Sequence, residues 1–310
     1  MLSRSSYDNP TFSSVTKIGD NNTGRVSLTY RDQWNNISKG AYSSALVEAD
    51  YSIYQSVVDN WNGGLFFYND VSNSGIYTIT GATLVSSYGR KLMNQRHNKA
   101  SLFLGAGLGY HNTNISSSGL WFGRQYDQSI FEVNTDLSSG EPPLADNLSY
   151  FSIDFGIRLI NEFRNIETEF ALATAHLNNP TIGSFDNPES IGTRVTGLAS
   201  IAIKVNRSII HQFQTKFISQ VRALQIVPGY ILKLSVNDYD DYQLLVGAGL
   251  RVVNNIEGLG AESLIFSAGI QSSSWIGSIS YDLNVSDLNF HTRGGGAFEL
   301  TLGYLLTRPQ

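Results

Sequence analysis

The chain contains 310 residues with no cysteine, 15% charged residues and a formal net charge of −5. The lack of cysteine excludes both a disulfide framework and a thiolate metal site. The net negative charge and the lack of a stripe of basic residues along the sequence argue against nucleic-acid binding. No run of about 18 apolar residues occurs, which excludes a membrane-spanning helix. Charged residues are scarcer than the roughly 25% of soluble domains, whereas glycine and aromatic residues are plentiful.

The first 24 residues are polar and rich in turn-forming residues, and they end in the stretch Gly19–Gly24. We expect residues 1–24 to form an N-terminal periplasmic segment. Residues 1–6 lack the apolar core of a signal peptide. We therefore expect the sequence to be that of a mature, exported chain.

Beyond residue 24, apolar and polar residues alternate with a period of two, which predicts β-strands. The alternation is clearest at 151–159, 242–252 and 275–285. A tilted barrel strand needs roughly nine to eleven residues to cross a membrane, and it has an apolar outer face and a polar inner face. These runs have that length and that pattern. The expected strands are 25–31, 44–53, 62–68, 76–87, 101–111, 151–159, 166–176, 194–205, 209–221, 225–236, 242–252, 264–270, 275–285 and 297–304.

Two of the expected strands are irregular. The inside–outside phase of 76–87 is ambiguous, and Pro228 within 225–236 predicts a bulge or a local kink because proline cannot donate a backbone hydrogen bond.

The count of about fourteen strands is even, as in single-chain bacterial barrels. We therefore predict an all-β fold, a closed antiparallel transmembrane β-barrel that forms one outer-membrane domain over residues 25–306. Links after even-numbered strands are mostly short and those after odd-numbered strands mostly long, including a long extracellular loop at 113–149; links 89–98 and 222–224 depart from this pattern. A soluble β-sandwich also alternates, but its strands are shorter and its outer faces are richer in Lys and Glu.

Four segments that bracket the chain resemble one known family. Tyr7–Thr11 is similar to an Asn-Pro-Ala motif, with Thr11 in place of the usual Ala, and Leu28–Trp34 is similar to a Tyr-Arg-x-Gln-Trp signature. Ser280–Leu288 and Gly296–Leu300 resemble the closing strands of the same family. The family is PorP/SprF, an outer-membrane component of the Bacteroidetes type IX secretion system.

This resemblance implies a multi-pass barrel in the bacterial outer membrane that serves export or surface attachment of large proteins, including gliding adhesins. It also implies two kinds of protein partner: a secreted surface protein bound through its type IX C-terminal domain, and other components of the secretion system. The barrel surface itself is expected to contact outer-membrane lipid.

The strand phases place a set of charged residues on the inner face. Arg or Lys facing lipid near the bilayer midplane would cost about 2–4 kcal/mol, so a common inward phase is the expected one. These charges form either a network that braces the lumen or a wet surface that docks a polypeptide. The predicted lumen-facing charges are Glu48, Asp50, Asp154, Arg158, Lys204, Lys233, Arg251, Asp282 and Glu299.

The loop at 113–149 is the longest link, and loops longer than roughly 12–15 residues tend to be functional or disordered. It is rich in Ser, Asn and Gly and carries four aromatic residues, which we expect to fold over the barrel mouth or to contact a partner. The predicted partner-binding residues are Trp121, Phe122, Tyr126 and Phe131.

No motif for catalysis, cofactor binding or metal binding emerges, and we expect the protein not to be an enzyme. Gly105–Gly109 lies within a strand and not before a helix, so it does not indicate a nucleotide site. Three aspartates at 238–241 could hold calcium, although a solvated turn explains them better. Two alternative functions are a channel for small solutes and an outer-membrane hydrolase, which would need Ser, His and an acid to converge at the rim.

Overall fold

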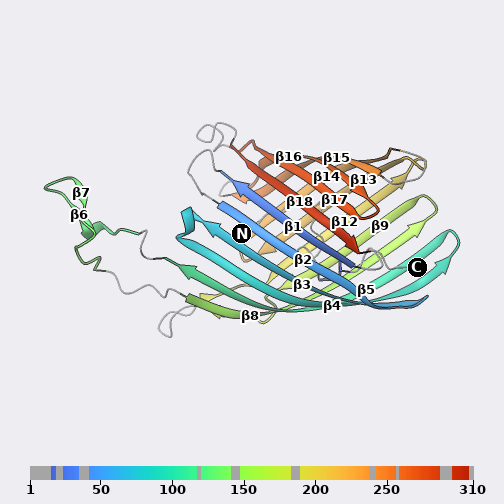
Figure 1. The fold of residues 1–310 in the computed structure, drawn as a ribbon, viewed down its shortest axis with the longest axis horizontal. Helices are drawn as coiled ribbons and strands as arrows, with labels where there is room; N and C mark the ends of the chain where they lie inside the picture. Colours follow the sequence, from blue (N-terminus) through green and yellow to red (C-terminus); the bar gives the residue numbers. More distant parts are fainter. Residues whose placement is uncertain are drawn as a thin grey trace.

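The computed structural model describes residues 15–18, 24–34, 42–116, 120–140, 147–182, 189–236, 242–255, 258–286 and 295–306. Fourteen antiparallel strands form a closed barrel, which confirms the predicted fold class (Figure 1). None of the described helices is long and apolar enough to cross a membrane. The barrel strands are β1 (Gly24–Gln33), β2 (Tyr42–Gln55), β3 (Asp59–Ser72), β4 (Tyr77–Gln95), β5 (Asn98–Ile115), β8 (Asn147–Phe163), β9 (Ile166–Ala175), β12 (Arg194–Lys204), β13 (Ile209–Gln220), β14 (Ala223–Ser235), β15 (Tyr242–Asn255), β16 (Gly258–Ser272), β17 (Trp275–Asn284) and β18 (Ala297–Leu306).

Each strand pairs with its sequence neighbours in the barrel, and β1 closes the cylinder by pairing with β18 from Gly24↔Leu306 to Gln33↔Ala297. Closure leaves no sheet edge, so each barrel strand has a hydrogen-bonding partner on both sides. Two short hairpins, β6 (Tyr126–Asp127) with β7 (Glu132–Val133) and β10 (Thr181–Ile182) with β11 (Glu189–Ser190), lie outside the barrel sheet.

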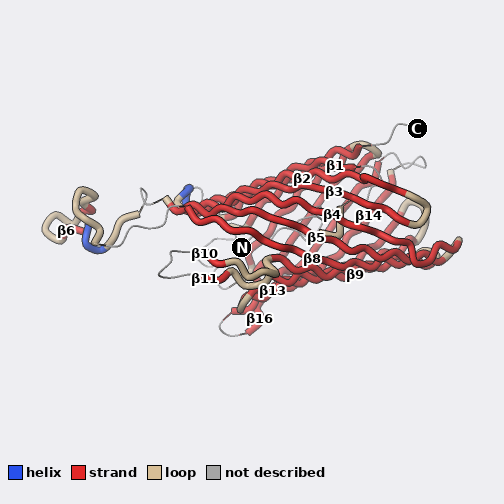
Figure 2. The backbone as a smooth tube through the Cα atoms, turned by 90° about the horizontal axis from the view of Figure 1, so that it is seen from below, coloured by secondary structure: helices blue, strands red, loops and turns tan. Residues whose placement is uncertain are grey.

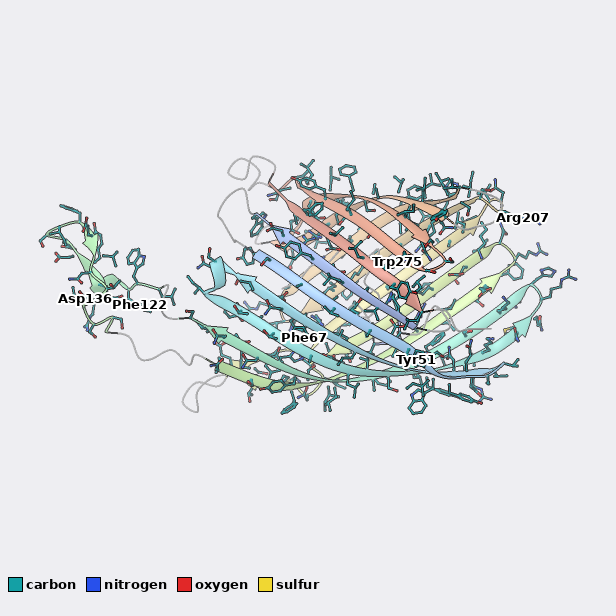
Figure 3. The ribbon with its side chains drawn as sticks, in the orientation of Figure 1. Tyr51, Phe67, Phe122, Asp136, Arg207 and Trp275 are labelled. Carbon is teal, nitrogen blue, oxygen red and sulfur yellow. The ribbon has the colours of Figure 1, made fainter. Side chains whose placement is uncertain are left out.

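The two faces of the wall differ as the alternation predicted. In β17, Trp275, Ile279 and Tyr281 are exposed, whereas Ser280 and Asp282 are buried. The ambiguous strand β4 has Leu84 exposed on the outside and buried residues Thr83 and Val85 on the inside. Figure 3 shows Tyr51, Phe67 and Trp275 on the outer side of the barrel wall.

Exposed Tyr and Trp side chains of the barrel wall lie toward its two ends, as is typical of the two membrane–water interfaces of outer-membrane barrels, whereas exposed Phe side chains such as Phe67, Phe155 and Phe266 also lie between them. One girdle consists of Tyr51, Trp61, Tyr88, Trp275 and Tyr304, and the other of Tyr30, Tyr110, Phe151, Tyr281 and Phe298.

The links define two ends of the barrel. The short-turn end carries links 56–58, 96–97, 164–165, 205–208 and 273–274, and the long-loop end carries 73–76, 116–146, 176–193 and 285–296. Link 89–98 was expected to be long, but β4 and β5 continue through it to a two-residue turn at 96–97. The predicted loop 113–149 is likewise shortened to 116–146 because β5 and β8 extend into it.

Pro228 lies in β14 opposite Thr215 of β13. On the β15 side, the ladder lacks pairs at residues 227 and 228 but has the same register at Ile226↔Val252 and Gly229↔Gly249. The predicted bulge is therefore absent. Because proline has no N–H to donate, the local effect is an interruption of the ladder.

Part of the N-terminal segment lies inside the barrel. Val15 and Ile18 are buried and pack with the inward side chains of β2, β3 and β4, namely Leu46, Phe66, Tyr68 and Val85. The four residues 15–18 therefore occupy the lumen, whereas the sequence analysis placed all of 1–24 in the periplasm. Gly24 begins β1, and residues 1–14 and 19–23 lie outside the described part of the chain.

A matched pair of variants tests the inside–outside phase of β16. Ala268 is exposed on the outer face, and the adjacent Ser267 is half-buried on the inner face. Ala268→Arg is expected to lower the free energy of unfolding by about 2–4 kcal/mol, because it places a charge in lipid. Ser267→Arg is expected to cost clearly less. Urea titration of the two refolded barrels measures the difference, and equal losses would contradict the assigned phase.

Candidate functional site

The structure places the nine predicted lumen charges in three ways. Lys233 is half-buried, and Lys204 is exposed because β12 ends there, so Lys204 lies at the rim and not inside the lumen. The other seven are buried in the inner face of the wall: Glu48, Asp50, Asp154, Arg158, Arg251, Asp282 and Glu299.

Asp282 is the centre of the largest ion-pair cluster. Its Oδ2 atom lies 2.6 Å from Nη2 of Arg31 and 2.8 Å from Nη1 of Arg251. Arg31 also contacts Glu299 at 3.4 Å, and Arg251 contacts Glu262 at 3.7 Å. These residues come from β1, β15, β16, β17 and β18, so one cluster joins five strands and bridges the β1–β18 closure. Neither Arg31 nor Glu262 was among the lumen charges predicted from the sequence.

A second cluster attaches the N-terminal segment to the opposite wall. Oε1 of Glu169 lies 2.9 Å from Nε of Arg158 and 3.0 Å from Nζ of Lys17. Nη1 of Arg158 also donates to the carbonyl oxygen of Thr16 at 3.4 Å. Lys17 and Glu169 were not predicted, because no sequence pattern relates a residue before the first strand to one in β9.

Inward-facing glycines make room for residues 15–18. A Cβ atom on Gly105 would lie 2.7 Å from the carbonyl oxygen of Val15, and one on Gly156 would lie 3.0 Å from a Val15 methyl group. A Cβ on Gly64 would lie 3.1 Å from Ile18. The glycine-rich stretch of β5 therefore serves close backbone approach.

Ser152, His176 and Asp154 lie together in the lumen wall, but their hydrogen bonds differ from those of a hydrolase triad. The Ser152 hydroxyl donates to Asp154 Oδ1 at 2.5 Å, and His176 Nδ1 lies 3.1 Å from the same hydroxyl oxygen. Since a hydroxyl has one hydrogen, Ser152 accepts from His176. The imidazole therefore does not act as a base toward the serine, and Ser152 is fully buried.

A cavity of about 620 Å³ opens toward the long-loop end beside the Asp282 cluster. Its floor contains Arg31, Arg251 and Asp282, and Trp34 and Glu262 contribute to its sides. The volume is within the roughly 300–1,000 Å³ of ligand pockets. The wall is apolar near Leu259 and polar near Asn284 and Ser286, so the cavity can accept an amphipathic side chain or a short peptide segment.

Residues 120–140 project beyond the long-loop end and do not cover the barrel mouth (Figures 1 and 2). Of the four predicted partner-binding residues, Trp121, Tyr126 and Phe131 are exposed and Phe122 is half-buried. Gln125 organises the loop by donating to the carbonyl oxygen of Leu137 at 3.0 Å and accepting from the Phe122 N–H at 3.0 Å.

This projecting loop is acidic as well as aromatic. It carries Asp127, Glu132 and Asp136 against Arg124. Hydrogen bonds from the Ser129 hydroxyl and backbone N–H hold the pKa of Asp127 below its usual range. Asp127 therefore stays ionised at neutral pH.

The aspartates at 238–241, considered above as a possible calcium site, lie outside the described residues. Among the residues that the structure does describe, no group of three or more His, Cys, Asp or Glu could hold a metal ion.

Removing the charge of Asp282 tests the ion-pair cluster. Asp282→Asn is expected to lower the free energy of unfolding by about 3–5 kcal/mol, because two buried guanidinium groups lose their shared carboxylate. Asp136→Asn, on the exposed loop, is the control and should change it by less than about 0.5 kcal/mol. Urea titration measures both, and an unchanged midpoint for Asp282→Asn would mean that the cluster does not brace the barrel.

The position of residues 15–18 in the lumen can be tested by cysteine labelling, because the chain has no cysteine of its own. Thr16 is fully buried, so Thr16→Cys is expected to react slowly with a maleimide. Adding Gly105→Leu should displace the segment and make the thiol react at least about tenfold faster. Gly197→Leu is the control, since its Cβ would approach nothing closer than 3.8 Å. Equally slow reaction of the thiol in both double variants would show that Gly105 does not determine where residues 15–18 bind.

Comparison with solved structures finds other outer-membrane barrels at low sequence identity. The CymD monoaromatic hydrocarbon channel is 10% identical with a TM-score of 0.50, over 91% of this chain and 87% of that chain. CdiB from Acinetobacter baumannii is 8% identical with a TM-score of 0.49, over 91% of this chain but only 59% of that chain. At 10% identity the likeness to CymD shows the fold alone.

The sequence itself identifies the family. No curated protein matches it significantly. Residues 2–304 match the family model described as type IX secretion system membrane protein PorP/SprF, as the motifs in the sequence predicted. The chain therefore belongs to the PorP/SprF family and is an outer-membrane β-barrel of the type IX secretion system.

Proposed function

We propose that this barrel is a non-enzymatic partner-binding component, which helps to export or anchor a secreted surface protein by holding that protein's C-terminal domain. The observation that carries the proposal is the loop of residues 120–140, which presents aromatic side chains to solvent beyond the long-loop end. Trp121 is 59% exposed and Phe131 is 78% exposed. Large aromatic residues exposed together are typical of protein-binding surfaces.

The filled lumen supports binding over conduction of solutes. Residues 15–18 are buried against β3, β5 and β8, and the Asp282 and Glu169 clusters occupy different parts of the inner wall. Barrels of about eight strands are filled by side chains alone and those of 16–18 strands leave a channel. This barrel has fourteen strands, and part of its own chain occupies space that an open channel would need.

The same features argue against a hydrolase. The only meeting of serine, histidine and acid that we find among the described residues is the buried Ser152 group, where the serine hydroxyl hydrogen is already donated to Asp154. The cavity of about 620 Å³ beside Asp282 is the second feature that a partner could use. It opens at the same end of the barrel as the projecting loop, so one partner domain could contact both.

Truncating the exposed aromatics tests the proposal. Trp121→Ala with Phe131→Ala is expected to lower retention of the secreted partner by at least about 30-fold, because central aromatic residues of an interface commonly contribute about 2 kcal/mol or more. The measurement is purification of the tagged barrel from its native outer membrane in mild detergent, with quantitative mass spectrometry of the proteins retained.

Trp275→Ala is the matched control, since Trp275 is as exposed as Trp121 but belongs to the aromatic girdle of the barrel wall. The control should retain the partner at the wild-type level. Retention of the same secreted protein by the double loop variant would contradict the proposed surface. A barrel that is purified without secretion partners and conducts ions in a planar bilayer would favour the channel instead.

A further inference from the structure

The short-turn end carries an unusual concentration of basic residues. Three successive hairpin ends, residues 90–99, 161–167 and 203–209, contain seven basic and two acidic residues, a net charge of +5 in a chain whose total is −5. We call these three segments the basic arc. All seven basic residues are exposed: Arg90, Lys91, Arg96, Lys99, Arg164, Lys204 and Arg207.

Backbone hydrogen bonds join the three hairpins into one surface. The N–H of Arg164 donates to the carbonyl oxygen of His97 at 3.0 Å, which ties the β8–β9 turn to the β4–β5 turn. The N–H of Lys204 donates to the carbonyl oxygen of Asn165 at 2.8 Å, and Asn165 returns a hydrogen bond to the Lys204 carbonyl at 3.1 Å. The basic arc is therefore held in place by the barrel.

The arc lies next to the aromatic girdle at its own end of the barrel. Trp61 and Tyr88 of that girdle pair across β3 and β4, and Arg90 follows Tyr88 by two residues on the same face. Aromatic girdles mark the level of lipid headgroups. The basic side chains therefore begin at that level and continue outward, toward Arg207 at the end of the barrel opposite the projecting loop (Figure 3).

Apolar side chains are interspersed with the charges. Leu92 is 56% exposed and Met93 is 41% exposed between Lys91 and the turn, and Val205 is exposed beside Lys204. The Arg164 guanidinium lies over the Phe163 ring, 5.3 Å from its centroid. Apolar groups that alternate with cations suit a surface whose partner has both an anionic head and an apolar body.

We propose that the basic arc binds the phosphate headgroups of anionic phospholipids in the leaflet at the short-turn end. Guanidinium and ammonium groups donate charge-assisted hydrogen bonds to phosphate oxygens, while Leu92, Met93 and Phe163 contact the adjoining acyl chains. Short turns are periplasmic in bacterial outer-membrane barrels, and the periplasmic leaflet is composed of phospholipid. The proposal does not depend on the identity of the secreted partner.

The test compares matched charge reversals in the full chain. Each barrel is reconstituted into nanodiscs of phosphatidylcholine with or without phosphatidylglycerol, extracted gently, and examined by native mass spectrometry for the lipids it retains. The wild type is expected to retain phosphatidylglycerol in preference to phosphatidylcholine. Arg90→Glu with Arg96→Glu should lower this preference by at least about tenfold, because each basic residue at the headgroup level contributes roughly a fivefold preference. Arg124→Glu with Arg222→Glu, at the long-loop end, should leave it unchanged.

Three results would overturn the proposal. One is a wild type without preference for phosphatidylglycerol, and another is an equal loss in both double variants. The third is stronger retention of lipid A than of phosphatidylglycerol from nanodiscs that contain both, which would assign the arc to the other leaflet. If the arc variant does not assemble, as judged by heat-modifiable gel migration, the salt dependence of the wild type's lipid preference tests the proposal. Its preference must then fall steeply as salt is raised, and a salt-independent preference would contradict an electrostatic site.

Discussion

The structure depends on one constraint: inside a bilayer, each backbone N–H and C=O must find a partner within the protein. In this chain a closed β-sheet satisfies the constraint. Pairing of β1 with β18 is therefore the contact on which the other features depend, because it removes the last two free edges. Once the sheet is closed, the period of two assigns alternate side chains to lipid and to the lumen.

Closure creates a second physical problem, which is how to fill a cylinder of fourteen strands. Long side chains reach inward and neutralise one another, as Arg31, Arg251 and Asp282 do. Elsewhere glycines leave a shallow space that the chain's own residues 15–18 occupy. Polar bracing and an inserted segment together fill part of the lumen. The projecting loop and the cavity beside Asp282 lie at one end of the barrel, and the basic arc lies at the other.

The parts that the sequence predicted are those that follow from the alternation. Strand β17 was recognisable because Ile279, Tyr281 and Leu283 alternate with the polar residues Ser278, Ser280, Asp282 and Asn284. The same rule failed at the end of β4, where Arg90 and Lys91 interrupt the apolar pattern although the strand continues to Gln95. The rule also placed buried charges such as Asp282 on the correct side of the wall. Which charges pair depends on register between distant strands, and the insertion of residues 15–18 depends on glycines from three strands, so neither was predictable locally.

The pairing of Arg31 with Glu299 and Asp282 has a consequence for how a polypeptide could leave the barrel. Some barrels could in principle release a strand sideways into the membrane by parting their first and last strands. Here, parting β1 from β18 would separate a buried guanidinium from both of its carboxylates in a poorly hydrated interior. The lateral route is thus closed by electrostatics as well as by ten backbone pairs. A polypeptide partner of the proposed kind is therefore expected to contact the barrel at its ends, and not to pass through its wall.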